Sequence, residues 1–89
     1  MTWKIKYARS AQKAAKKIDR KARQRIREYL EGRVAKMDDP RQLGQPLKGK
    51  LSTLWRYRVG DYRVVCELRD EALVVLVIRI GHRREVYER

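Results

Sequence analysis

Three β-rich runs fill the second half of the chain and leave few folds open to it. They span roughly residues 53–59, 62–69 and 73–80. Gly60-Asp61 separates the first two runs, and a two-residue connection containing glycine is typical of a tight hairpin. Residues 69–72 form the second turn. The third run is apolar at almost every position and is predicted to be a central strand, whereas the first run alternates and is predicted near an edge.

The first half of the chain predicts one short strand followed by two helices. Apolar and polar residues alternate from Trp3 to Tyr7, which indicates a strand with one apolar face. Apolar residues then recur at helical spacing in two stretches, from Ala11 to Ile18 and from Ala22 to Met37. Ser10 and Asp19 precede these stretches and are the expected N-caps.

The element order defines the predicted fold class. Asp38-Asp39-Pro40 is expected to end the second helix, because a residue before proline avoids the helical region. Residues 38–52 contain two prolines and two glycines and are predicted to form an ordered loop. The resulting β-α-α-β-β-β order predicts an α+β fold in which a helical hairpin packs on a small, mainly antiparallel sheet. A length of 89 residues allows one domain, 1–89.

The charge of the chain indicates a polyanionic partner. Its net charge is +13, and such self-repulsion disfavours a compact state unless something compensates it. All nine lysines lie in residues 1–50, whereas residues 51–89 carry eight arginines and no lysine. A guanidinium binds phosphate through two parallel hydrogen bonds, while an ammonium acts as a point charge. A nucleic acid, a membrane surface or an acidic protein would each suit the net charge. The first half of the chain predicts general attraction, and the second half predicts recognition.

Several classes of protein are excluded at this stage. No apolar run approaches the length of a membrane span, and the N-terminus lacks a secretion signal, so a cytoplasmic location is expected. Cys66 is the only cysteine, which excludes an internal disulfide and a multi-cysteine metal site. No metal or other cofactor is expected.

Three arginines are predicted to share one face of the hairpin. If Val59 pairs with Tyr62 across the turn, Arg58 lies opposite Arg63. Arg56 lies two residues before Arg58, and strand residues two apart face the same way. Like charges across a ladder are destabilising, so the arrangement predicts a phosphate-binding face. A solvated sheet face whose arginines spread into water is the alternative.

The segment after the last strand combines several reactive side chains. Residues 81–87 read Gly-His-Arg-Arg-Glu-Val-Tyr. Cleavage of RNA through the ribose 2′-hydroxyl needs a base, cations for the charge on phosphate, and an acid for the leaving oxygen. His82 can act as base or acid, Arg83 supplies charge, and Tyr87 suits the acid role. The alternative is a solvated histidine in a basic tail and a tyrosine that only packs.

The chain resembles the RelE family of toxin–antitoxin systems over nearly its whole length. The order of elements is similar, and so are four motifs: Leu47-Lys48-Gly49, Leu54-Trp55-Arg56-Tyr57-Arg58, Gly60-Asp61-Tyr62-Arg63-Val64-Val65 and Gly81-His82-Arg83-Arg84-Glu85-Val86-Tyr87. The resemblance implies a RelE-like fold and a ribosome-dependent endoribonuclease that cuts mRNA in the decoding site. It also implies a cognate, RelB-like antitoxin that holds the toxin inactive.

The resemblance carries over to individual positions. Arg63 matches the phosphate-stabilising arginine of the family, Arg83 the arginine after the last strand, and Tyr87 the tyrosine that orients or protonates at the scissile site. Arg56 and Arg58 stand where the best-known members have lysines.

This departure leaves the identity of the general base open. Arginine stays protonated at any relevant pH, so neither Arg56 nor Arg58 can replace a lysine base. His82 is the natural replacement, and Tyr87 as a tyrosinate is the second candidate. In a third alternative the chain only orients the 2′-hydroxyl and stabilises charge, and ribosomal RNA and water complete the transfer.

The partners follow from charge and from the resemblance. The lysine-rich helices are expected to bind ribosomal RNA, and the arginines to meet mRNA. The antitoxin is expected to be acidic where it docks and to form a hetero-oligomer with the toxin. Two other functions remain open, a ParE-type inhibitor of DNA gyrase without nuclease activity and an RNA-binding module that does not cleave.

Overall fold

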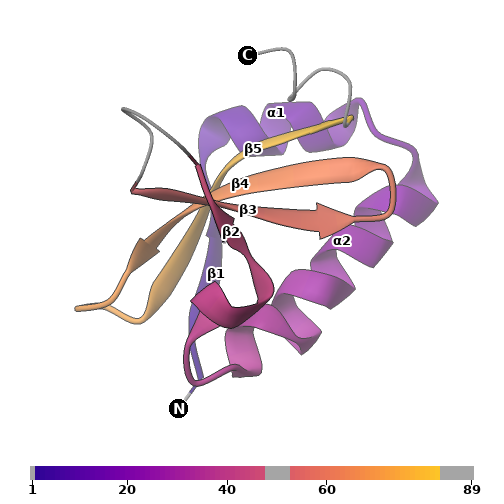
Figure 1. The fold of residues 1–89 in the computed structure, drawn as a ribbon. Coiled ribbons are helices and arrows are strands. Elements are labelled where there is room, and N and C mark those ends of the chain that lie inside the picture. The colour runs from indigo at the N-terminus through magenta and orange to yellow at the C-terminus, as the bar shows by residue number, and fades with distance from the viewer. Residues whose placement is uncertain (1, 48–52, 83–89) are drawn as a thin grey trace.

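A five-stranded mixed sheet forms one layer of the structure (Figure 1). The computed structural model describes residues 2–47 and 53–82. The strands are β1 (Lys4–Tyr7), β2 (Gln45–Pro46), β3 (Leu54–Val59), β4 (Tyr62–Arg69) and β5 (Val74–His82). Their order is β1-β5-β4-β3-β2, with β1 parallel to β5 and every other neighbouring pair antiparallel. The predicted fold class is confirmed, with one added strand, β2.

The positions of the strands differ in detail from the prediction. β5 has a neighbour on each side, as an apolar strand requires, but β4 occupies the middle of the sheet. β3 lies near an edge, as predicted, and β2 covers its outer side. β2 was missed because two exposed residues inside a loop give no periodic signal. Pro46 is tolerated there because an edge strand has no outer partner that needs its missing N–H.

The hairpin between β3 and β4 has the predicted register. Val59 pairs with Tyr62, and Arg58 pairs with Arg63. Gly60 has a φ of 59°, in the left-handed region that glycine adopts at no steric cost. A positive φ at the first turn position gives a twist that matches the flanking strands. The turn therefore sets which residues of the two strands share a face.

Two helices, α1 (Arg9–Lys16) and α2 (Arg20–Gly32), cover one face of the sheet (Figure 1). The Asp19 carboxylate caps α2 as predicted, because its Oδ1 accepts hydrogen bonds from the backbone N–H groups of Lys21 and Ala22 at 2.6 and 3.3 Å. The prediction of Ser10 as the cap of α1 is wrong. Ala8 occupies the N-cap position without a side-chain hydrogen bond.

Both helices are shorter than their apolar patterns suggested. α1 ends at Lys16, two residues before Ile18, and α2 ends at Gly32 instead of continuing to Met37. The chain continues as a short 3₁₀ helix, η1 (Val34–Lys36), which buries Val34 in the core. Apolar residues at helical spacing are therefore buried beyond the C-terminal end of α2, in the 3₁₀ helix that follows it.

A β-bulge interrupts the pairing of β4 with β5. Val65 pairs with Arg79 and Cys66 with Val77, so Ile78 has no partner on β4. The Ser10 hydroxyl donates a hydrogen bond to the Ile78 carbonyl at 2.6 Å. Ser10 thus ties α1 to the bulge instead of capping its own helix.

The core fills the space between the helices and the sheet. Its buried residues come from both helices, η1, three strands and the residue that precedes β1: Trp3, Ala11, Ile26, Leu30, Val34, Tyr57, Val59, Val64, Cys66, Val75, Val77 and Ile80. Strand residues that alternate with these point to the other face of the sheet. We call this second face the open face, because neither helix covers it.

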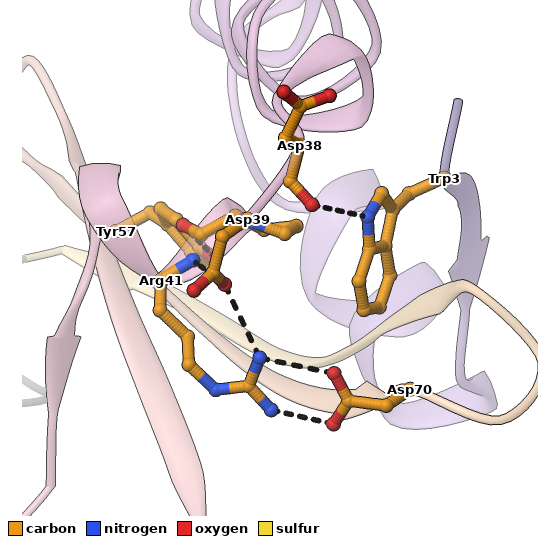
Figure 2. A network of polar contacts seen from close by, with 7 residues as sticks. Trp3, Asp38, Asp39, Arg41, Tyr57 and Asp70 are labelled. Carbon is orange, nitrogen blue, oxygen red and sulfur yellow. Dashed lines mark hydrogen bonds and ion pairs between the residues drawn. The ribbon is translucent and has the colours of Figure 1, made fainter. Parts of the chain in front are cut away.

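The loop after α2 is held by polar contacts to the sheet (Figure 2). It forms a second 3₁₀ helix, η2 (Pro40–Leu43), and the buried Tyr57 hydroxyl donates to the Pro40 carbonyl at 2.9 Å. Arg41 forms two hydrogen bonds to the Asp70 carboxylate, at 3.0 and 2.6 Å, and a third to Asp39 at 3.2 Å. The loop is therefore pinned to β3 and to the turn after β4.

We expect Gly44→Ala to destabilise the fold. A Cβ at this position would lie 2.9 Å from Cε1 of Tyr57, whose ring cannot retreat because its hydroxyl is bonded. Such overpacking costs about 1–3 kcal/mol. Gly32→Ala is the control, because nothing lies within 4 Å of its Cβ and alanine stabilises a helix by about 0.5–1 kcal/mol. Urea unfolding of both variants measures the difference, and equal stabilities would contradict this packing.

The Arg41–Asp70 ion pair predicts a loss of stability in acid. Its hydrogen bonds hold the pKa of Asp70 below the ordinary value of 3.8. A carboxyl whose pKa is lower in the folded state contributes stability above its unfolded pKa, and that contribution disappears as the pH falls through the folded value. We therefore expect Asp70→Asn to flatten the decline in unfolding free energy below about pH 4. Chemical unfolding between neutral pH and pH 3 tests this. If the unfolding free energy of Asp70→Asn declines with pH as steeply as that of the wild type, the ion pair does not contribute to stability.

Candidate functional site

Arg56, Arg58 and Arg63 gather around one cavity on the open face. The cavity has a volume of about 220 Å³, and Leu43 and Gln45 complete its lining. β3 supplies two of the arginines and β4 supplies the third, in the register predicted from the hairpin. We call these three residues the arginine cluster.

The members of the arginine cluster differ in exposure. Arg63 is 3% exposed, whereas Arg58 is exposed and Arg56 is half-buried. The Arg56 guanidinium donates a hydrogen bond to the Gln45 side-chain oxygen at 2.7 Å. Burial of a guanidinium is costly and restricts its orientation, so Arg63 is no freely solvated side chain. The alternative of an arginine that spreads into water therefore does not apply to Arg63, whereas Arg58 is exposed.

The described strands carry little negative charge on the open face. Glu67 is the one acidic residue within the described strands, and Arg69 binds it with Nε at 2.7 Å from Oε1. No described acidic side chain forms an ion pair with Arg58. Guanidiniums that converge on a small cavity favour a compact anion with several oxygens, and phosphate has this chemistry.

His82 lies on the other side of the sheet from the arginine cluster. It pairs with Tyr62, while Arg63 pairs with Gly81, and consecutive rungs of a ladder point to opposite faces. The His82 ring contacts the Tyr62 ring edge to face, with 5.7 Å between centroids. Both rings line a separate cavity of about 290 Å³ beside the start of α2, together with Arg25. The structure thus does not bring His82 to the predicted phosphate-binding cavity.

Arg83 and Tyr87 lie outside the described residues, and so does Glu85. Their predicted roles stay predictions.

Arg79 is a cationic residue of the open face that the sequence analysis missed. It pairs with Val65, which in turn pairs with Arg56, so these three side chains form one rung of the open face. In a ladder without the bulge, Arg79 would pair with Val64 and point into the core. A run of apolar residues with one arginine gives no signal of a bulge, so its position could be found only from the structure.

The other groups whose pKa values are shifted have a structural role. Burial raises the pKa of the Cys66 thiol, and burial also raises the pKa of the Tyr57 hydroxyl. Burial and the hydrogen bond to Glu31 raise the pKa of Tyr7. All three stay protonated near neutral pH and face the helices.

Within residues 2–47 and 53–82, no cluster of histidine, cysteine and carboxylate side chains is suited to a metal ion. None of the described helices has the length and apolarity to cross a membrane.

A family model describes most of this chain. The model of the ParE toxin of the type II toxin–antitoxin system parDE matches residues 5–87. The chain belongs to the RelE/ParE superfamily of type II toxins. The toxin is 25% identical to the toxin RelG of Mycobacterium tuberculosis, over the full length of both chains.

Solved structures show the same fold. The toxin–antitoxin complex RelBE2 of M. tuberculosis contains a chain that is 23% identical, with 93% of each chain covered and a TM-score of 0.86. A double mutant of the Escherichia coli toxin RelE in the free state is 24% identical, covers 99% of this toxin and 93% of that chain, and gives a TM-score of 0.77. The intact RelBE complex of E. coli shows that such a relative binds an antitoxin.

A wide groove runs along the helical side of the toxin. Its volume is about 800 Å³, and it lies between the two helices beside Tyr7. Ala11 and Ala15 line it, together with one carboxylate, Glu28, and four cations: Lys16, Arg20, Arg23 and Arg27. This groove combines apolar surface with positive charge, on the face opposite the arginine cluster.

We expect Arg58→Gln to stabilise the toxin while weakening its response to anions. The change removes a like-charge pair across the β3–β4 ladder, which costs about 0.2–1 kcal/mol. Phosphate should raise the melting temperature of the wild type more than chloride at equal ionic strength, and Arg58→Gln should lose much of this difference. Arg33→Gln, which removes one charge beside Tyr29 on the helical side, serves as the control. An equal phosphate effect in all three proteins would show that the cavity binds no anion.

Proposed function

We propose that this toxin is a ribosome-dependent endoribonuclease that cuts mRNA in the decoding site. The observation that carries the proposal is the convergence of Arg56, Arg58 and Arg63 on one cavity, with Arg63 buried and therefore oriented. Cleavage through the 2′-hydroxyl builds negative charge on the scissile phosphate. Cations fixed in advance stabilise that charge without reorganising during the reaction. The RelE-like fold of its relatives supports the same proposal.

The arginine cluster is proposed to bind the scissile phosphate. Arg63, held in the sheet, is the fixed contact, and the exposed Arg58 opposite it closes on the phosphate from the hairpin side. The Gln45 side chain orients Arg56 through its hydrogen bond. Arg83 and Tyr87 are proposed to join this site from the C-terminal segment, with Tyr87 as the acid for the leaving oxygen.

The position of His82 bears on the identity of the base. Because its ring lies against Tyr62 on the helical side, His82 is poorly placed to accept a proton at the arginine cavity. This favours Tyr87, or the alternative in which ribosomal RNA and water complete the proton transfer. A toxin that supplies charge and orientation but no complete acid–base pair would depend on the ribosome for activity. No step of this mechanism requires a metal or another cofactor.

The helical side is proposed to hold the macromolecular partners. The lysines of α1 offer contacts to ribosomal RNA phosphates. The groove between the helices suits an amphipathic acidic segment of a RelB-like antitoxin, since two alanines and four cations line it. Relatives crystallised with their antitoxins support a hetero-oligomer of this kind. A cytoplasmic location follows for a protein that acts on ribosomes.

The deciding measurement is primer extension on a defined mRNA, with and without programmed ribosomes. We expect the wild type to cut at the decoding site only when ribosomes are present. Arg83→Ala should lower the cleavage rate by about 10²–10³-fold, the usual effect of removing one charge-stabilising group. Tyr87→Ala should lower it by about 10²–10⁴-fold if Tyr87 is the general acid. Arg33 does not line the cavity, and the Arg33→Gln variant should cut at the same positions as the wild type.

The outcomes separate the competing functions. Ribosome binding by Tyr87→Ala at wild-type affinity would show that the loss is chemical. Wild-type protein that binds ribosomes without cutting would overturn the nuclease and leave an RNA-binding module. The matching ParE family model supports a second candidate function, inhibition of DNA gyrase. Inhibition of gyrase supercoiling by purified toxin, without RNA cleavage, would establish it.

A further inference from the structure

Arg79 extends the positive charge of the open face beyond the arginine cluster. The rung Arg56–Val65–Arg79 crosses three strands, so its two arginines stand two strand spacings apart, roughly 10 Å between backbones. Arg56 lines the cavity at one end of this rung. Arg79 therefore lies on the same rung as a residue that lines the cavity, along a line perpendicular to the strands.

Arg79 is available to a ligand in the described structure. Its side chain is exposed, and it forms no ion pair with any described acidic residue. Arg69, another arginine of the open face, differs in this respect because it is bonded to Glu67 at 2.7 Å. The open face thus contains a cavity with three guanidiniums and one further guanidinium on the same rung as Arg56.

The bulge at Ile78 is what puts Arg79 on this face. The bulge moves Ile80 into the core and turns Arg79 outward, and Ser10 holds the bulge by its hydrogen bond to the Ile78 carbonyl. Bulges commonly re-aim a side chain beside a functional site. The outward position of Arg79 adds one more positive charge to the open face of a chain with a net charge of +13.

We propose that Arg79 contacts the phosphate next to the one held by the arginine cluster, so that the open face grips two adjacent phosphates of a single RNA strand. This inference rests on the proposed function and adds the path of the substrate, which crosses β3, β4 and β5. Successive phosphates of one RNA strand can each bind one of several separated guanidiniums. A positively charged surface that follows the backbone is typical of single-strand binding. Arg79 acts here as a binding residue and takes no part in bond cleavage.

The test is the salt dependence of binding to a short 2′-O-methylated oligoribonucleotide, which cannot be cleaved through its 2′-oxygen. Fluorescence anisotropy titrations between roughly 50 and 200 mM salt give the slope of log K against log salt. Each phosphate contact to a single strand contributes about 0.7 to that slope. We expect Arg79→Gln to reduce the slope by about 0.7, and Arg33→Gln to leave it unchanged.

The outcomes distinguish this inference from the proposed nuclease. If Arg79→Gln and Arg33→Gln have the same slope as the wild type, the second phosphate contact is wrong, whatever the cleavage assay shows. If Arg79→Gln alone reduces the slope while the wild type cuts no mRNA on ribosomes, the contact stands and the nuclease fails. If the wild type does not bind the oligonucleotide at all, the contact is overturned. Circular dichroism confirms that both variants remain folded.

Discussion

The β-bulge between β4 and β5 is the constraint on which the functional surface depends. A strand offers only two faces, and inserting one residue exchanges them for every position that follows. Before the bulge, Cys66 pairs with Val77 and both side chains point into the core. After the bulge, Ile80 points into the core and Arg79 points to the open face. The carbonyl of the extra residue, Ile78, accepts a hydrogen bond from a hydroxyl group at an exposed position. α1 provides that donor through Ser10, so the packing of a helix on one face fixes the charge on the other.

Stability and function make opposite demands on the hairpin. Its turn and its apolar residues favour the register that places Arg58 opposite Arg63, and this register brings like charges together. Tyr57, on the same strand, points the other way and is fully buried, with its hydroxyl bonded to Pro40. The strand is thus anchored on its core side strongly enough to tolerate repulsion on its open side. A bound anion would lower the repulsion between Arg58 and Arg63, which is consistent with the proposed phosphate site.

Local patterns predicted the architecture, and non-local contacts set its details. The hairpin could be derived from Gly60-Asp61 and the strands around it, and the Asp19 cap from the residues that follow it, since both are interactions between close neighbours in sequence. The role of Ser10 could not, because its partner lies 68 residues away, and a serine before a helix looks the same whether it caps the helix or bonds to a strand. The side of the sheet taken by His82 depended on a bulge that apolar residues do not reveal. The arginine cluster was predictable because its three members flank one turn.

The separation of His82 from the arginine cluster bears on the proposed ribosome dependence. A nuclease that cleaves free RNA needs its base, acid and cations on one surface. In this toxin the sheet itself lies between the imidazole and the converging guanidiniums. The described part of the chain therefore offers charge and orientation at the cavity without a base beside them. Such a site would be inert on most RNA that the toxin meets, and would gain activity only where another molecule bends the mRNA and presents its 2′-hydroxyl. Under the proposed function, the ribosomal decoding site would hold the mRNA in that way, and this requirement would confine cleavage to translated messages.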